Sequence, residues 1–350
     1  MLKYFWESYL LTIIGLVAAY FWGEHIYPGD GFTAVFMALA LGVLEVSLSF
    51  DNAVVNALRL EKMSKKWQHR FLTIGILIAV FGMRFLFPLL IVACIAKLNI
   101  IKVLNLALTN VETYSYYLAQ THATIVTFGG AFLMMLALNF FINTDKEVDW
   151  LKFIERPLKK AAKHKNLAAL ITLFTLFLVQ SNIIPTILKI KIIAAGLLGM
   201  TTFFVIEYIS KWLEKKNEKR LADGTTIACA GLAGFIYLEL IDASFSFDGV
   251  LGAFAISTDI IIIMIGLSIG AIFVRSLTIL LVEKKTLKKF AYIAHGAHWA
   301  VLGLALTMFI SVLCDMPEYV PATIGLVCII SSLIASVIEN KKIDNQSEER

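Results

Sequence analysis

Two short stretches of the chain place carboxylates, serines and an asparagine in strongly apolar surroundings. The first is LEVSLSFDNAVV at 44–55, which carries Glu45, Ser47, Ser49, Asp51 and Asn52. An ionisable side chain inside a bilayer costs about 3 kcal/mol or more unless it is paired, hydrated or bound to a cation. Carboxylate, hydroxyl and amide oxygens are hard donors that suit Mn²⁺, Ca²⁺ or Mg²⁺. The chemistry indicated is therefore the binding of a cation or of protons.

The second stretch, LIDASFSFDGVL at 240–251, repeats the first at one constant offset. Glu45 falls on Asp242, and Asn52 falls on Gly249, where the copies diverge. The other shared polar positions are Ser244, Ser246 and Asp248, which match Ser47, Ser49 and Asp51, and Phe247 matches Phe50. Each motif is followed by an apolar segment with one arginine, Arg84 in FGMRFLF and Arg275 in IFVRSLT. This agreement in residues and in order indicates an internal duplication.

The acids in the apolar segments outnumber the bases. Glu45, Asp51, Glu207, Glu239, Asp242 and Asp248 stand against Arg84 and Arg275. We expect the arginines to act as structural counter-charges and a cation or protons to supply the rest. Neither motif holds Cys or His, which argues against copper, and His295 and His298 are expected to be interfacial or core residues rather than ligands. The predicted metal ligands are Glu45, Asp51, Asn52, Asp242 and Asp248, with Ser47, Ser49, Glu239, Ser244 and Ser246 as supporting ligands or a proton relay.

Composition places these motifs in a membrane protein. Of 350 residues, 59% are hydrophobic and 16% charged, with a mean hydropathy of +0.79, whereas soluble domains carry about 25% charged residues. Runs of about 20 apolar residues are long enough to span a bilayer. The sequence predicts an all-α polytopic protein of about ten membrane-spanning helices: 4–22, 32–57, 71–96, 120–142, 167–187, 190–213, 226–256, 259–282, 291–314 and 319–338.

Basic residues orient these helices. They cluster at 59–70, 146–165, 211–220 and 284–289, whereas the alternate loops at 23–31, 257–259 and 315–320 have no Lys or Arg. Cytoplasmic loops are enriched in Lys and Arg, so both termini are expected in the cytoplasm, with the protein in the plasma membrane of a prokaryote. The net charge of +5 then reflects topology rather than nucleic-acid binding. The expected partners are membrane lipids and a divalent cation.

The parity of the helix count makes the two copies inverted, because five crossings separate the two motif helices. The predicted organisation is an N-terminal helix with an outer loop (1–30), a first three-helix repeat (31–142), a basic inner loop with linking helices (143–225), a second, inverted three-helix repeat (226–314), a C-terminal helix (315–338) and a flexible tail (339–350). Inverted repeats with a polar site at their interface are a recurring transporter architecture. Asp51 and Asp248 would lie about 9 Å from the central acids, in opposite directions.

The spacing within each motif leaves two conformations open. In an unbroken helix, Glu45, Ser49 and Asn52 share one face, while Ser47 and Asp51 lie on another. The polar residues nevertheless recur at every second position, a period that favours an extended or partly unwound stretch. Such a stretch would also release carbonyl oxygens for a cation.

EVSLSFDN (45–52) and ELIDASFSFDGVLGAFAIS (239–257) resemble the two acidic signatures of the TerC family of integral membrane proteins. The likeness covers both repeats, roughly 30–140 and 225–315. It implies export of a divalent metal, chiefly manganese, with the motif acids as ligands, within a family named for tellurite resistance. The chain departs from that pattern at Gly249, where many members carry Ser, and in a longer middle region.

The resulting hypothesis is a non-enzymatic exporter of a divalent cation, Mn²⁺ first and Ca²⁺ second, working by alternating access with proton coupling and needing no cofactor. One alternative is an intramembrane aspartyl protease with Asp51 and Asp248 as its dyad. That alternative leaves the duplicated Glu45 and Asp242 unexplained. The other is a non-transporting membrane assembly or stress-resistance factor, which leaves the buried charge unexplained.

Overall fold

The computed structural model is helical along its length. It describes the whole chain except residues 1, 27, 62, 76, 144–147, 162–165, 181–184, 223–230, 233, 243–252, 254–256, 258, 284–289, 315, 318 and 349–350, and it contains no strand in the described part. The helices are α1 (Leu2–Ile26), α2 (Gly31–Leu48), α3 (Phe50–Leu60), α4 (Lys65–Arg70), the π-helices η1 (Phe71–Gly75) and η2 (Ile78–Leu86), α5 (Phe87–Ala96), α6 (Ile100–Thr109), α7 (Val111–Ala119), α8 (His122–Ile142), α9 (Lys152–Lys160), α10 (Leu167–Leu178), α11 (Thr186–Ala222), α13 (Ile260–Glu283), α14 (Ile293–Ser311) and α15 (Tyr319–Glu348). Residues 234–242 are also helical.

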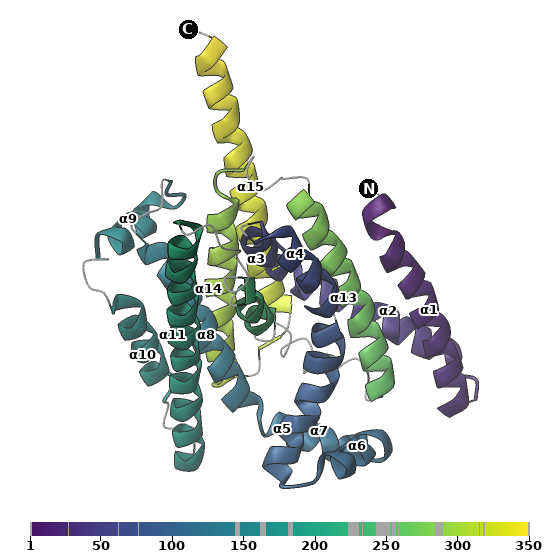
Figure 1. The fold of residues 1–350 in the computed structure, drawn as a ribbon. Coiled ribbons are helices and arrows are strands. Elements are labelled where there is room, and N and C mark those ends of the chain that lie inside the picture. The colour runs from purple at the N-terminus through teal and green to yellow at the C-terminus, as the bar shows by residue number, and fades with distance from the viewer. Residues whose placement is uncertain are drawn as a thin grey trace.

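Eight helices in the described residues are long and apolar enough to cross a membrane, which confirms an all-α polytopic membrane protein. They overlap eight of the ten expected segments, with ends that differ by up to six residues where they begin or end outside them, and both chain ends lie on the same side of the bundle (Figure 1). At 167–187 the structure has α10, whose 12 residues rise only about 18 Å and fall short of the roughly 30 Å hydrocarbon core. The segment expected at 226–256 lies largely outside the described residues.

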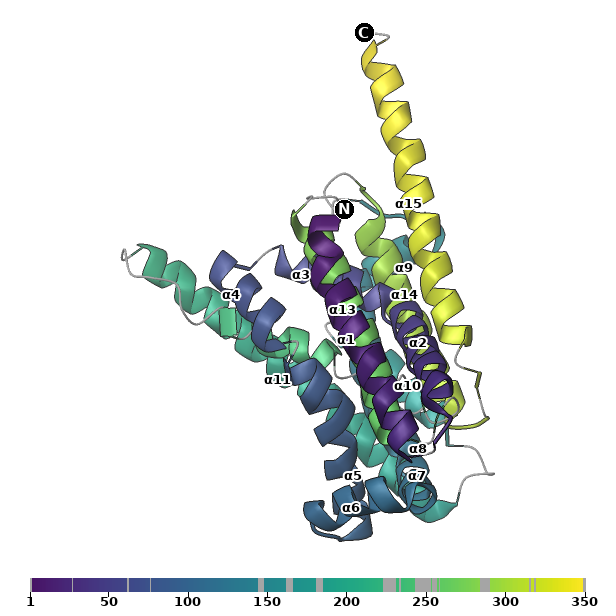
Figure 2. The same ribbon diagram turned by 90° about the vertical axis from the view of Figure 1, so that its right-hand side faces the viewer.

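Three regions differ from the sequence-based expectation. The expected span 32–57 is divided into α2 and α3. The connection after residue 96 contains two short helices, α6 and α7, and the side chain of Asn99 caps α6 by accepting a hydrogen bond from the Ile101 amide at 3.1 Å. Residues 339–348, expected to form a flexible tail, continue α15 well beyond the bundle (Figure 2). No Gly or Pro follows Gly325 to end that helix.

The two copies of the motif region pack crosswise. α2 and α3 of the first copy lie against α13 of the second, and α8 lies against α14, while α1 covers both α2 and α13 (Figures 1 and 2). On the reciprocal side, the rings of Trp67 and Phe71 lie 5.9 and 6.3 Å from that of Phe235. The segment of the first copy that holds its motif thus packs on α13 of the second copy, and the segment that follows it packs near Phe235 of the second copy.

A glycine-lined contact brings α13 close to the first motif. A Cβ at Gly270 would overlap the Cβ of Glu45, and one at Gly266 would lie 2.7 Å from the carbonyl oxygen of Ala38. Small residues at helix contacts let backbones approach closely in membranes. Glu45 is therefore held between α2 and α13, with 1% of its surface exposed.

Candidate functional site: a polar cavity between the two copies

The first motif is helical rather than extended. α2 ends at Leu48 and α3 begins at Phe50, and the helical path is interrupted only at Ser49, where φ is −103° and ψ is 12°. The Ser49 amide still donates to the Glu45 carbonyl at 2.9 Å, and the Ala53 amide donates to the Ser49 carbonyl at 3.1 Å. The every-second-residue pattern therefore does not produce an extended strand here. The corresponding part of the second motif, 243–250, lies outside the described residues.

One face of this helical motif carries the polar residues that meet the second copy. Ser49, Asn52 and Asn56 are spaced three and four residues apart, so they form one stripe on α3 and its first turn. All three line a cavity. Ser47 does not belong to that stripe: it is exposed, and its hydroxyl donates to the Val43 carbonyl at 2.8 Å.

The cavity volume is about 40 Å³, counted as the space that the centre of a water molecule can occupy. About 10–15 Å³ on this measure holds one water, so a small ion with part of its hydration shell fits. Side chains and backbone from α3, the π-helical segments, residue 242 and α13 line it: Ser49, Asn52, Asn56, Phe71, Gly75, Ala79, Val80, Arg84, Asp242, Ala271, Val274, Arg275 and Thr278.

A hydrogen bond across the cavity joins the two motifs. The Asn52 Nδ2 atom donates to Asp242 Oδ1 at 2.6 Å. The two residues come from different copies and are 190 positions apart. This bond is the direct contact between the described polar residues of the first motif and those of the second.

Arg84 and Glu45 form a buried ion pair beside the cavity. Arg84 Nη2 contacts Glu45 Oε1, and the side chains are 4% and 1% exposed. The Ser49 hydroxyl donates to the same carboxylate oxygen at 2.8 Å, and Arg84 Nη1 donates to the Ala79 carbonyl at 2.9 Å. The geometry is that of a counter-charge, as expected for Arg84. Glu45, predicted as a metal ligand, has both an arginine and a serine as partners.

Arg275 has a different kind of partner. Its Nη1 atom lies 3.0 Å from Glu7 Oε2 of α1, and the two side chains are 19% and 47% exposed.

The sequence analysis did not identify Glu7, because Glu7 lies outside both duplicated segments. It also missed Asn56 and Thr278. The signal for Asn56 was present, since it stands four residues after Asn52 on the same helical face.

Glu239 lies next to the cavity, but Glu207 does not. The Glu239 Oε1 atom is buried and has no hydrogen-bond partner among the residues that the structure describes, and a Cβ at Gly75 would lie 2.6 Å from it. Glu207 instead binds Lys211 at 2.7 Å and accepts from Asn139 at 3.2 Å. A carboxylate oxygen that lacks a donor is one that a cation or a proton would satisfy.

The described residues contain no group of three or more His, Cys, Asp or Glu side chains placed to hold a metal ion. Four of the predicted site residues have side chains that lie outside the described residues: Asp51, Ser244, Ser246 and Asp248. The side chains of Asp51 and Asp248, the alternative protease dyad, therefore both lie outside the described residues. The described donors are hard oxygens, from Ser49, Asn52, Asn56 and Asp242.

Comparison with known proteins places the chain in a family. A family model described as "Protein of unknown function (DUF475)" matches residues 50–343. The chain belongs to DUF475. The match includes Asn52, Arg84, Asp242 and Arg275, and it begins after Glu45.

A relative of this DUF475 protein is an uncharacterized membrane protein of Rickettsia conorii. The two are 27% identical over 137 residues, which is 39% of this chain and 42% of the relative. The match thus spans about two-fifths of the relative's length. Its name agrees with the membrane-spanning helices found here. No solved structure matches the chain.

Proposed function

We propose that this DUF475 protein is a membrane transporter that exports a divalent cation, Mn²⁺ first and Ca²⁺ second, by alternating access with proton coupling. The observation that carries the proposal is the Asn52–Asp242 bond across a small polar cavity between the two copies. Substrate sites of transporters with inverted repeats lie at such an interface, near the bilayer midplane.

The charge balance around the cavity supports a cationic rather than an anionic substrate. Four acids in the described residues, Glu7, Glu45, Glu239 and Asp242, lie at or beside the cavity together with two arginines, Arg84 and Arg275. With every group ionised, this set carries two excess negative charges. Because uncompensated charge in a membrane is costly, a cation or protons are expected to balance it.

The contacts also suggest how the site changes accessibility. Glu45 is tied to Arg84 within the first copy, whereas Asp242 is tied to Asn52 across the copies. A rocking motion of one copy against the other would leave the first pair intact and separate the second. Asp242 would then exchange its donor for a cation or a proton.

The TerC resemblance and the basic residues complete the proposal. TerC-like signatures in both motifs favour metal export, and the basic side that carries both chain ends is taken as the cytoplasmic side of a prokaryotic plasma membrane. The protein acts without a resident cofactor, and the divalent cation is its substrate.

The test is flux into proteoliposomes containing the purified protein, across a panel of Mn²⁺, Ca²⁺, Mg²⁺ and Zn²⁺, with internal pH monitored. Asp242→Asn keeps the size of the side chain and removes its charge, so flux should fall at least tenfold. Glu207→Gln is the matched control: it also removes one acid from a membrane helix, but that acid pairs with Lys211 away from the cavity. Its flux should match the wild type.

Two further variants probe the acids that sequence alone singled out. Asp51→Asn and Asp248→Asn should each abolish efflux while the protein remains folded in the membrane. Wild-type flux of any one of the four cations by Asp242→Asn would contradict the assignment of that residue. An absence of flux for every cation in the wild type would contradict the proposed function.

A further inference from the structure

α9 combines a basic stripe with an exposed apolar side. Lys152, Arg156 and Lys160 stand four residues apart, so they form one row along the helix, and all three are exposed. Phe153 lies beside that row and is 91% exposed, and Ile154 is 41% exposed. A nine-residue helix in water gains nothing by presenting a phenylalanine in this way.

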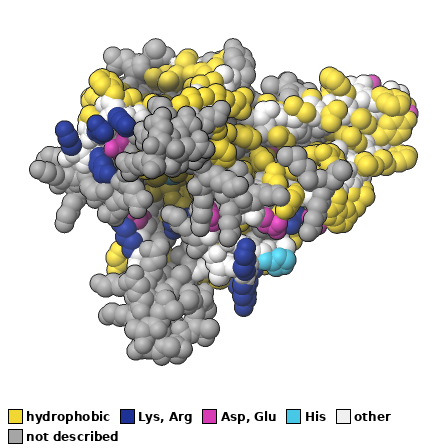
Figure 3. Space-filling view, turned by 90° about the horizontal axis from the view of Figure 1, so that it is seen from above, with side chains coloured by type: hydrophobic (Ala, Val, Ile, Leu, Met, Phe, Trp, Pro, Cys, Tyr) yellow, Lys and Arg dark blue, Asp and Glu magenta, His cyan; other side chains and the backbone are white. Residues whose placement is uncertain are grey.

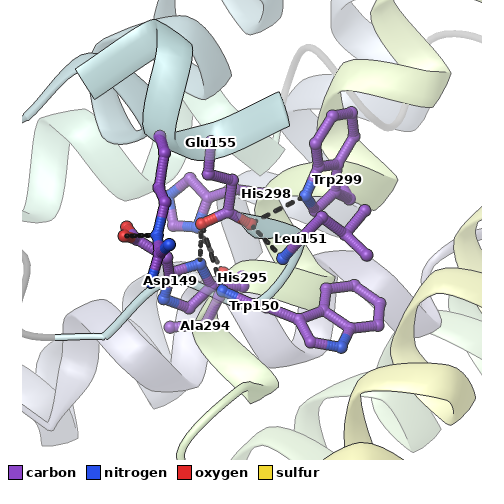
Figure 4. Close-up of polar contacts among 9 residues, drawn as sticks. Asp149, Trp150, Leu151, Glu155, Ala294, His295, His298 and Trp299 are labelled. Atoms are coloured by element: carbon purple, nitrogen blue, oxygen red, sulfur yellow. Dashed lines mark hydrogen bonds and ion pairs between the residues drawn. The ribbon is translucent and has the colours of Figure 1, made fainter. Parts of the chain in front are cut away.

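A buried acid fixes α9 to the bundle (Figure 4). Glu155 is 0% exposed; its Oε2 atom lies 2.7 Å from His295 Nδ1, and Trp299 Nε1 donates to its Oε1 atom at 3.1 Å. The amides of Trp150 and Leu151 each donate to the same carboxylate at 3.3 Å. Glu155 points inward, whereas the basic row and Phe153 are exposed and therefore lie on the part of α9 that faces away from the bundle. Their orientation is therefore built into the fold.

α9 lies at the level where membrane helices end. His295 is the third residue of α14, and α9 also packs against the membrane helix α8. It is on the side of the bundle that carries both chain ends (Figure 1). Seen from that side, Lys and Arg side chains gather at the left edge, where Figure 1 places α9 (Figure 3).

We infer that α9 lies in the headgroup layer of the membrane and binds anionic phospholipids. The basic row faces the phosphates, and Phe153 and Ile154 enter the boundary with the acyl chains. On α9 the basic row and Phe153 share the side that faces away from the bundle, so the long Lys and Arg side chains can reach the phosphates while the phenylalanine ring enters the boundary layer. Charge complementarity favours an anionic lipid: Glu155 is turned inward, and Asp149 lies 3.9 Å from Arg156, which leaves Lys152 and Lys160 as exposed charges without an ion pair among the described residues.

The first measurement is native mass spectrometry of the full chain in detergent, titrated with phosphatidylglycerol and, separately, phosphatidylcholine. Each basic residue near an anionic surface is worth about a fivefold change in affinity, so Lys152→Gln with Lys160→Gln should weaken phosphatidylglycerol binding by an order of magnitude or more. The matched control is Lys152→Arg with Lys160→Arg, which changes the same two exposed positions but keeps both charges. The control should bind as the wild type does.

The second measurement locates position 153 in proteoliposomes. A spin label on Phe153→Cys should be reached by oxygen and shielded from a water-soluble relaxant, about 5–10 Å below the headgroup boundary. Equal weakening of phosphatidylglycerol binding in the two double variants would overturn the inference. A label at position 153 that is exposed to water in vesicles containing phosphatidylglycerol would also overturn it. Neither outcome depends on transport, so this inference can fail while the proposed function holds.

Discussion

The two copies carry equivalent arginines that have acquired different partners. In the first copy, Arg84 pairs with Glu45 of the same copy, and both side chains are almost fully buried. In the second, Arg275 pairs with Glu7 of α1, which belongs to neither copy, and the pair is partly exposed. Duplication has preserved the residue type, but the surroundings of each arginine decide its role.

The central acids of the two motifs, Glu45 and Asp242, also have different partners. Because Arg84 holds Glu45, the central acid of the first motif is neutralised within its own copy. The central acid of the second motif, Asp242, instead accepts a hydrogen bond from the neutral Asn52, while Arg275 pairs with Glu7. We interpret Arg84–Glu45 as the fixed half of the site and Asn52–Asp242 as the half that can exchange partners.

The largest expected effect separates the two arginines directly. Arg84→Met leaves the Glu45 carboxylate buried without its counter-charge, which typically costs about 3–5 kcal/mol. Arg275→Met breaks a partly exposed pair worth about 0–1 kcal/mol. The free energy of unfolding, measured by titrating the purified protein from mild detergent into SDS, should show this order. Equal losses in the two variants would end the distinction between a buried and a peripheral pair.

A glycine next to Glu45 tests how tightly the first pair is held. Gly270→Ala should destabilise the protein by about 3 kcal/mol, because the added methyl overlaps Glu45 and the backbone cannot move aside easily. Gly82→Ala is the control on η2, where the new Cβ meets Ile78 at an ordinary 3.4 Å. The same SDS titration compares them. If Gly270→Ala unfolds as the wild type does, α13 is not closely packed on α2.

Glu155 extends the comparison to a buried acid outside both copies. Burial alone would raise its pKa, but the hydrogen bonds from His295 and Trp299 outweigh burial and lower the pKa to about 2. The unfolded pKa is about 4.3, so the stabilisation is complete above that pH and is lost as the pH falls toward 2. The difference in unfolding free energy between wild type and Glu155→Gln should reach about 2–3 kcal/mol at pH 5. It should shrink at pH 2.5, and a constant difference across this range would contradict the assignment.

The smallest effect concerns the bond that joins the copies. Asn52→Leu removes a donor to a carboxylate and should cost about 2 kcal/mol. Asn56→Leu should cost less, because the buried Asn56 Oδ1 atom has no hydrogen-bond partner in the described residues. Proteoliposome flux gives the sharper measure: Asn52→Leu should slow transport more than Asn56→Leu. The reverse order would place the exchanging half of the site elsewhere.

Much of the site could be predicted from residue types and spacing. Helical periodicity correctly put Glu45, Ser49 and Asn52 on one face and Ser47 on another, because a residue's direction on a helix depends only on its position. The counter-charge role of Arg84 followed from the cost of burying it alone. The extended stretch was wrong for the first motif: the period of two reflected two helical faces, one toward the cavity and one away from it.

Sequence by itself determined that this chain spans the membrane and that its polar groups come in two related sets. Those properties follow from local composition and from repetition, which folding does not alter. Only the tertiary structure decided the partners: that Arg275 meets Glu7, that Asn52 meets Asp242, and that Glu155 meets His295. Each of these contacts joins residues 140 or more positions apart. Such contacts depend on how helices pack, and spacing along the chain does not encode that packing.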